Sequence, residues 1–294
     1  MKTLLEVLQS GTDYLARQGC DEARAIVQHL MAHVLHCNRT ALYSRFDRPV
    51  EEAELAPLRE LLKRRAAGEP LQHLLGFTEF FRRDFLTDAR ALIPRPETEE
   101  LVEMVLKKIP DHPVRILDMG TGSGVIGVTL ALELKERAGE VVLADISPQA
   151  LDLALENAMR LGARVSTIQT NLFANIPQEK TDPHAEDADS APEGGKGENG
   201  RNMLFDVIVA NLPYIAEGEK LAPEVMKDPH TALFGGPKGW EIIERFLARA
   251  RDYLNEDGFV ALEIGYDQAS VVTQIMDGYG YNYIEVLKDM SGVS

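Results

Sequence analysis

Apolar residues at helical spacing dominate the first part of the chain. Leucines recur along LLEVLQSGTDYLARQG, and apolar residues step by four along DEARAIVQHLMAHVLH, so each segment has one apolar helix face. Gly19 is placed to end the first helix and Asp21 to cap the second. A third helix, ELAPLRELLKRRAAG, is expected to end in solvated basic residues, Lys63 to Arg65. The pattern predicts an N-terminal helical domain at residues 1–72.

The pattern changes in LLGFTEFFRRDFLTDARALIPRP, where phenylalanines are spread among polar residues and no helical period fits. Such a segment is typical of a β-hairpin, which we place at residues 73–93 as a linker between two domains. The next segment, PETEELVEMVLKKI, predicts a helix. Pro96 suits a first helical turn, and the acidic residues after it suit the positive end of the helix dipole.

From Val114 onward, short apolar runs alternate with amphipathic segments. The runs VRILDMG, EVVLADI, RVSTIQTNLF, FDVIVANLPY and GFVALEIG predict strands, and helices are predicted between most of them, one capped by Ser147. The last run, YNYIEVLKD, is interpreted as a further strand at the sheet edge. This alternation indicates an α/β domain at residues 94–294, with a doubly wound, mostly parallel, Rossmann-like sheet.

One segment, residues 178–202, has no apolar pattern and is dense in Gly, Pro, Asp and Glu, so we expect a disordered acidic surface loop. The whole chain is 45% hydrophobic and 27% charged, as is typical of soluble globular proteins. No apolar run approaches the ~18 residues of a membrane span. Two cysteines cannot form a disulfide framework, which favours a reducing cytoplasm. The net charge of −16 does not favour binding to a nucleic-acid backbone.

The stretch LDMGTGSGVIG follows the first predicted strand of the second domain. Gly120, Gly122 and Gly124 allow a sharp turn and a close approach of the backbone to a ligand. The stretch fits the pattern G-x-G-x-x-G, and the next strand ends in Asp145, whose carboxylate can accept hydrogen bonds from two ribose hydroxyls. Enzymes that use NAD and methyltransferases that use S-adenosylmethionine (SAM) both need this arrangement. The run that starts at Asp118 resembles the first motif of class I SAM-dependent methyltransferases.

A second candidate site follows the buried run VIVA, which ends at Asn-Leu-Pro-Tyr. The end of this strand is expected beside the topological switch point of the sheet, where ligands bind. A planar amide or aryl amine is a poor nucleophile because its lone pair is delocalised, so acceptors that hold its N–H groups can aim the lone pair at a methyl donor. The side-chain oxygen of Asn211 and the carbonyl of Leu212 are candidate acceptors, while Pro213 stiffens the turn and Tyr214 stacks on the planar group. Alone, the tetrapeptide favours an ordinary turn; with the glycine-rich stretch and the acid after the second strand, it favours catalysis.

Over nearly the whole chain apart from the acidic segment, the sequence resembles the release-factor glutamine N5-methyltransferases, the HemK/PrmC family. The resemblance rests on GEPLQHLLGFTEFF, LIPRPETEELVE, ILDMGTGSG, ADISPQALDLALENA, FDVIVANLPYI, HTALFGGPKGWEIIERF and LEIGYDQ, in this order. It implies a helical substrate-docking domain, a hairpin and a methyltransferase domain. It also implies methyl transfer from SAM to the glutamine of the Gly-Gly-Gln motif in peptide chain release factors, with S-adenosylhomocysteine as product.

The resemblance also implies site residues, carried over by position. SAM would be bound by Gly120, Thr121, Gly122, Ser123, Gly124, Asp145, Leu172 and Asn211. The glutamine amide would be held by the catalytic residues Asn211, Leu212, Pro213 and Tyr214, with Arg95 and Glu97 lining the substrate site. We expect no metal, a release factor as the protein partner, a monomer, no stable nucleic-acid or membrane partner, and a cytoplasmic location.

Two positions depart from the family pattern. Leu212 stands where the family usually has a second proline; its carbonyl can serve equally, on a looser turn. Asn171 in TNLF replaces the usual acid, and its amide oxygen can accept a hydrogen bond from the adenine amino group without a charge.

Three alternatives stay open on the sequence: an adenine N6-methyltransferase acting on RNA or DNA, a non-catalytic SAM-binding adaptor, and an NAD oxidoreductase. The tetrapeptide also occurs in adenine dimethylases of ribosomal RNA, so by itself it does not separate a glutamine methyltransferase from an adenine methyltransferase; the acidic charge and the PRPETE hinge favour glutamine. Glu263 and Gln268, in LEIGYDQ, suit either a functional role or hydrogen bonding at a strand end.

Overall fold

The computed structural model describes residues 2–177 and 203–288. The predicted acidic loop at residues 178–202 lies outside them. The chain divides into two compact units, one formed by Met1–Ile93 with Lys220–His230 and the other by Pro94–Glu219 with Thr231–Ser294. The first unit therefore contains the N-terminal helices, the hairpin and a segment from far along the sequence. The predicted boundaries of the helical domain at residue 72 and of the hairpin linker at residue 93 stay predictions.

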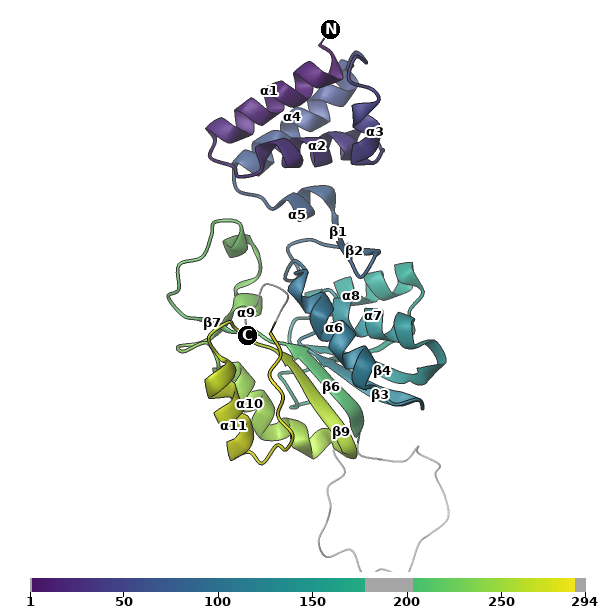
Figure 1. The fold of residues 1–294 in the computed structure, drawn as a ribbon, viewed down its shortest axis with the longest axis vertical. Helices are drawn as coiled ribbons and strands as arrows, with labels where there is room; N and C mark the ends of the chain where they lie inside the picture. The colour runs from purple at the N-terminus through teal and green to yellow at the C-terminus, as the bar shows by residue number, and fades with distance from the viewer. Residues whose placement is uncertain (1, 178–202, 289–294) are drawn as a thin grey trace, which may run out of the picture. The chain divides into compact units, whose positions relative to one another are not determined.

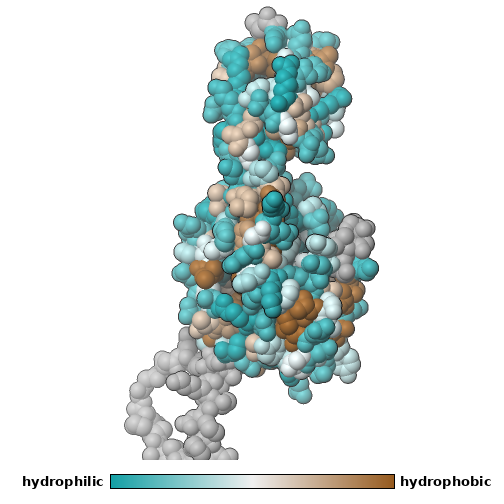
Figure 2. Space-filling view, turned by 90° about the vertical axis from the view of Figure 1, so that its left-hand side faces the viewer, coloured by the Kyte–Doolittle hydropathy of each residue, from teal (hydrophilic) through white to brown (hydrophobic). Residues whose placement is uncertain are grey.

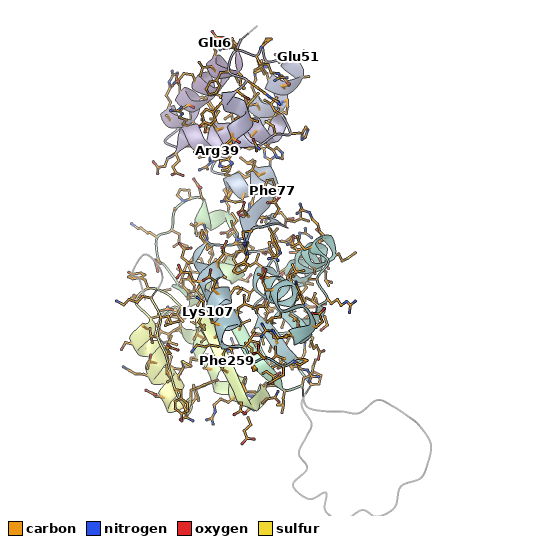
Figure 3. All side chains as sticks on the ribbon, turned by 45° about the vertical axis from the view of Figure 1, so that its right-hand side comes forward. Glu6, Arg39, Glu51, Phe77, Lys107 and Phe259 are labelled. Carbon is orange, nitrogen blue, oxygen red and sulfur yellow. The ribbon has the colours of Figure 1, made fainter. Side chains whose placement is uncertain are left out.

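The first unit holds a helical core and a β-hairpin (Figure 1). Its elements are α1 (Leu4–Arg17), α2 (Ala23–Val34), α3 (Arg39–Tyr43), α4 (Glu52–Ala66), α5 (Leu71–Leu75), β1 (Phe77–Phe80) and β2 (Arg83–Leu86). Capping boxes start α1 and α4, and they involve Glu6 and Glu51, which are labelled in Figure 3. Strands β1 and β2 pair antiparallel, and the turn between them places Phe81 and Arg82 at positive φ.

Two predictions about this unit are wrong. Helix α2 begins at Ala23 after Glu22, which adopts a left-handed conformation and makes no side-chain cap, so Asp21 does not cap the helix. Arg65 is not solvated. Only 4% of its surface is exposed, and its guanidinium pairs with the carboxylate of Glu224. A buried cation needs an anionic partner, and here a segment far along the sequence supplies it.

The second unit is built on a parallel five-stranded sheet in the order β5-β4-β3-β6-β9. The strands are β3 (Val114–Met119), β4 (Ala138–Asp145), β5 (Ser166–Gln169), β6 (Phe205–Asn211) and β9 (Leu254–Glu263). The principal helices are α6 (Glu97–Lys108), α7 (Val125–Leu134), α8 (Pro148–Leu161), α10 (Glu241–Ala250) and α11 (Ala269–Gly278). A short parallel pair, β7 (Ile215–Ala216) with β8 (Phe234–Gly236), and α9 (His230–Leu233) complete the described elements. The predicted α/β class is confirmed.

Helices cover both faces of this sheet: α6, α7 and α8 lie on one side, and α10 and α11 lie on the other (Figure 1). Successive side chains of a strand point to opposite faces of the sheet, so each strand supplies side chains to both helix layers. Leu117 and Ile208 pack in the same buried cluster as Phe246 of α10. Phe173 stacks on Phe246 and on Tyr253, with ring centroids 5.5 Å and 4.5 Å apart. The predicted cap of α8 is also confirmed, since Ser147 Oγ accepts a hydrogen bond from the Ala150 amide.

The predicted edge strand at residues 281–289 is wrong for the described part of that segment. Residues 281–288 form no strand, and among the described residues the sheet ends at β9. Gly280 turns the chain at φ 74°, and the Tyr281 hydroxyl donates to the carbonyl of Leu247 at 2.8 Å. These contacts bind the segment to α10, so its backbone does not pair with β9.

Helices of the described residues are all too short or too polar to cross a membrane. On the face drawn in Figure 2, hydrophilic residues predominate and hydrophobic residues occur in separate small patches.

Candidate functional site

The candidate site lies at the carboxyl ends of the parallel strands, where the chain order of neighbouring strands reverses. Strands β4 and β5 follow β3 on one side, whereas β6 lies on its other side, which makes the β3–β6 boundary the switch point. The glycine-rich loop follows β3, Asp145 ends β4, and Asn211 ends β6. The sheet therefore brings together three groups that are far apart in the sequence.

The backbone of the glycine-rich loop adopts conformations that residues with a side chain rarely adopt. Gly120, Gly122 and Gly124 have φ values of 73°, 55° and 85°. A Cβ at Gly120 would lie 3.0 Å from Cδ2 of Leu212, and a Cβ at Gly124 would lie 3.0 Å from the Cβ of Ala154 on α8. The glycines thus permit both the turn and its close packing, and the loop touches the tetrapeptide after β6.

Buried polar contacts hold the remaining residues of this loop. The Thr121 hydroxyl donates to Oδ2 of Asp118 at 2.6 Å, and the Asn157 side chain donates to the carbonyl of Ser123 at 2.9 Å. Thr121 and Ser123 are buried. The amides of Gly120 and Thr121 donate to the carbonyl of Ala144, so the loop is held to the end of β4.

Asp118 is a fully buried carboxylate behind the loop. Its Oδ2 accepts hydrogen bonds from Thr121 and from the Gly127 amide at 2.8 Å, while Oδ1 is buried without a partner among the described residues. Burial raises the pKa of Asp118 to about 6. The hydrogen bonds from Thr121 and Gly127 oppose this rise only in part. The carboxylate therefore opposes the stability of the unit at neutral pH.

Replacing Asp118 with asparagine is expected to remove the pH dependence that this carboxyl gives to the free energy of unfolding. A raised pKa favours the protonated form in the folded state, so the contribution of Asp118 to stability is full below pH ~4 and is lost as the pH rises through 6. Between pH 4 and pH 7 the free energy of unfolding of D118N should gain about 3 kcal/mol relative to wild type. Denaturant unfolding followed by fluorescence of the single tryptophan, Trp240, measures it. The exposed Asp111→Asn provides the control, and a difference that is constant with pH would contradict the prediction.

Asp145 presents a pre-oriented carboxylate at the end of β4. Its Oδ1 accepts from the amide of Ser147 and its Oδ2 accepts from the amide of Gly122, each at 2.9 Å. Burial raises the pKa of Asp145, and the backbone hydrogen bonds oppose that rise. Each oxygen keeps a lone pair for another donor, so the group fits the two ribose hydroxyls of a nucleoside. This acceptor, beside the tight glycine turn after β3, fits the nucleoside part of SAM.

The loop after β5 contains the other predicted cofactor residue, Leu172. It adopts φ 52° and is partly buried, and its carbonyl accepts a 2.7 Å hydrogen bond from the Thr170 hydroxyl. The neighbouring Asn171 is exposed, and its Oδ1 accepts from Nη2 of Arg245 at 3.3 Å. The amide oxygen expected to face the adenine therefore has a competing donor on α10.

Asn211 is held by side chains from two other elements. Its Nδ2 donates to Oγ1 of Thr98 at 3.2 Å, and the Thr98 hydroxyl donates to Oε2 of Glu263 at 2.7 Å. A hydrogen bond from Asn211 also lowers the pKa of Glu263, whereas burial, the larger influence, raises it. Leu212 is 4% exposed and packs in the core against Gly120. Core packing thus supports the turn at the position where a proline ring was expected.

Tyr214 is fixed through its backbone. Its carbonyl accepts a 2.8 Å hydrogen bond from Nε2 of Gln268, whose Oε1 accepts from the amide of Gly265. A Cβ at Gly235 would lie 2.5 Å from the carbonyl oxygen of Pro213, and one at Gly239 would lie 2.5 Å from that of Tyr214. The glycines of FGGPKG therefore let this segment pack directly on the tetrapeptide.

Charges surround the Tyr214 hydroxyl. Burial, with smaller contributions from Glu263 and Glu97, raises the pKa of Tyr214 to about 12, and Arg95 opposes that rise. Tyr214 is therefore a protonated phenol near neutral pH. Arg95 and Glu97, predicted to line the site, lie beside Thr98 at the start of α6 and act electrostatically on Tyr214 and Glu263.

Sequence reasoning missed Thr98 and left Glu263 and Gln268 undecided. The available signal for Thr98 was its place in PRPETE, directly after Glu97 in the first turn of α6. Within residues 2–177 and 203–288, no cluster of His, Cys, Asp and Glu could hold a metal ion.

Comparison with known proteins connects both units to described families. Residues 6–76 match the family model described as PrmC N-terminal domain, and residues 97–183 match that described as Methyltransferase small domain. A release factor glutamine methyltransferase of Geobacter sulfurreducens is 36% identical over 294 residues, covering 99% of this chain and 94% of the relative. One of Koribacter versatilis is 36% identical over 296 residues, covering 99% and 96%. Among solved structures, a ribosomal protein L11 methylase from Lactobacillus delbrueckii subsp. bulgaricus has a TM-score of 0.45 at 21% identity, covering 71% of this chain and 83% of that one.

Proposed function

The chain belongs to the release factor glutamine methyltransferase family, and from that premise we propose that it methylates N5 of the glutamine in the Gly-Gly-Gln motif of peptide chain release factors, with SAM as donor. The observation that carries the proposal is the orientation of Asn211 at the switch point. Its amide nitrogen is engaged by Thr98, so Oδ1 is available as an acceptor for a substrate N–H. The glycine-rich loop packs against the residue after Asn211, since a Cβ at Gly120 would lie 3.0 Å from Cδ2 of Leu212.

SAM supplies an electrophilic methyl group on a sulfonium. In the proposed site the carboxylate of Asp145 would accept hydrogen bonds from the ribose hydroxyls. The backbone of Gly120 to Gly124 would border the amino-acid part of the cofactor. Leu172 flanks the adenine. Asn171 has a weaker role, because Arg245 engages its side-chain oxygen.

The protein's contribution to catalysis is positioning. Asn211 Oδ1 and the Leu212 carbonyl accept the two N–H groups of the glutamine amide, which aims the nitrogen lone pair at the methyl carbon. Bound SAM would supply the methyl group: the N–C bond would form as the C–S bond pair stays on the sulfur of S-adenosylhomocysteine, and the amide would release one N–H proton to water. Pro213 restricts the turn, and the neutral Tyr214 ring borders the planar amide. No covalent intermediate with the protein is needed.

The remaining predictions extend this assignment. Arg95 and Glu97 line the substrate side of the site, and the helical unit contributes to release-factor docking. The enzyme acts as a monomer in the cytoplasm, where translation terminates.

The deciding experiment is transfer of labelled methyl groups from SAM. The chain is incubated with a release factor, with the same factor carrying Gln→Ala in its Gly-Gly-Gln motif, and with ribosomal RNA, and the label is located by mass spectrometry. Label on the motif glutamine, absent from the alanine variant, is expected. Label on RNA alone would support the adenine methyltransferase instead, and SAM binding without transfer to either would support the adaptor.

A further inference from the structure

A primary amide such as Asn211 can lie in its site in two ways, related by exchange of oxygen and nitrogen. Only one of them presents Oδ1 to an incoming N–H; the other presents an NH₂ group, which would repel the substrate amide donors. The tetrapeptide does not choose between them, because both have nearly the same shape. The choice depends on what contacts the amide from neighbouring elements.

Two neighbours make that choice in this structure. Thr98 lies at the start of α6 and is 3% exposed, and Glu263 ends β9 directly beside Asn211 in the register of β6 with β9. Asn211 Nδ2 donates to Thr98 Oγ1 at 3.2 Å, and Thr98 Oγ1 donates to Glu263 Oε2 at 2.7 Å. The amide nitrogen, the hydroxyl and the carboxylate thus form a directional relay of hydrogen bonds.

The direction of the relay follows from the acceptor at its end. An ionised carboxylate only accepts hydrogen bonds, so the single hydroxyl proton of Thr98 must go to Glu263. The hydroxyl lone pairs then face Asn211, and only its N–H can satisfy them. Glu263 lies directly beside Asn211 in the strand register, and Asn211 lowers the pKa of that carboxyl. Oδ1 is left as the remaining polar atom of the amide.

We propose that Thr98 and Glu263 are positioning residues that fix the Asn211 amide with Oδ1 toward the substrate nitrogen. The inference rests on the proposed glutamine methylation and adds two residues to its site. Neither residue touches the reacting atoms; each acts through Asn211. Reversal of the relay would turn the NH₂ group toward the substrate and remove the acceptor.

Protonation of Glu263 provides such a reversal. A protonated carboxyl can donate to Thr98, whose own proton is then free to go to Asn211 Oδ1. Burial raises the pKa of Glu263, and the charged or titratable groups acting on it are Arg95 and Glu97, near the start of α6, and Tyr214, after β6. At saturating SAM, kcat is therefore expected to fall as the pH drops through this raised pKa.

The test compares Thr98→Val with Thr98→Ser. Valine keeps the shape but removes the hydroxyl, and misorientation of the reacting groups typically costs about 100-fold in rate. We expect T98V to lower kcat for release-factor methylation by about 100-fold, with KM for the release factor and Kd for SAM within about threefold of wild type. T98S restores the hydroxyl and should recover most of kcat. Thr129→Val is the matched control, because Thr129 is equally buried, lies on α7 and has no hydrogen-bond partner for its hydroxyl among the described residues.

Glu263→Gln tests the other end of the relay. A glutamine can accept from or donate to Thr98, so E263Q should lower kcat about 10-fold and lose the acid limb of the wild-type pH profile. Equal loss in T98V and T98S, full activity in T98V, or an unchanged acid limb in E263Q would overturn the proposal. A wild-type chain that does not methylate the glutamine would instead contradict the proposed function itself, so the two failures are distinguishable.

Discussion

Asn211→Ala is expected to lower methyl transfer to the release-factor glutamine by about 10³-fold while SAM binding stays within about threefold of wild type. The alanine removes the acceptor that orients the substrate nitrogen, and single preorganised hydrogen-bond groups in enzyme sites account for about 10²–10³ in kcat. Loss of orientation lowers the rate further, because the nitrogen of a planar amide is a poor nucleophile unless its lone pair is aimed at the methyl group. Single-turnover transfer of labelled methyl groups, with calorimetric titration of SAM, separates the two effects.

Asn255→Ala is a suitable control for this variant. Asn255 lies near the start of β9, at the other end of the strand from Glu263, and donates to Asp206 at 2.6 Å. Its replacement should leave the rate of transfer unchanged. Transfer by Asn211→Ala at more than a tenth of the wild-type rate would refute the role of the amide as acceptor.

Asp145→Ala is expected to raise the Kd for SAM by at least about 100-fold. Hydrogen bonds to a charged group contribute about 1.5–3 kcal/mol each, and the proposed site contains two, from the ribose hydroxyls. The variant also frees the amides of Gly122 and Ser147, which loosens the loop that borders the cofactor. Isothermal titration with SAM measures the change, and denaturant unfolding verifies that the second unit is folded.

Asp152→Ala is the matched control, since Asp152 is an exposed acid on the neighbouring helix α8. It should bind SAM as wild type does. An unchanged Kd in Asp145→Ala would show that the carboxylate does not hold the ribose, and the cofactor assignment of the β4 end would have to be abandoned.

Local signals predicted the elements of the second unit well. The runs of the central strands β3 and β6 are short and mostly apolar, as buried parallel strands are, and turn residues follow them. Ser147 was predicted as a cap from its place before a helix, and it caps α8. The glycines of the first loop were predicted from their spacing, and their positive φ values are conformations that glycine adopts at little cost.

Two of the three errors share one physical origin, which is that distant contacts overrode local preference. YNYIEVLKD has the composition of an edge strand, yet the Tyr281 hydroxyl binds the carbonyl of Leu247 and directs the segment to α10. Arg65 has the sequence context of a solvated helix end, yet Glu224, more than 150 positions later, pairs with it and buries it. Asp21 is a favourable cap residue, but the left-handed Glu22 starts α2 one residue later.

The sequence by itself determined the α/β class of the second unit, the family, and the residue types proposed to bind a planar nitrogen and a nucleoside, because these depend on local pattern and on motif order. It contained Thr98, Glu263 and Gln268 without revealing their use. Only the tertiary structure decided that Thr98 and Gln268 bond to the Asn-Leu-Pro-Tyr turn and that Glu263 bonds to Thr98, since the three come from α6, the segment before α11 and β9. It also decided that Leu212 packs under Gly120. Such contacts arise when the sheet brings strand ends together, and no spacing along a single chain records them.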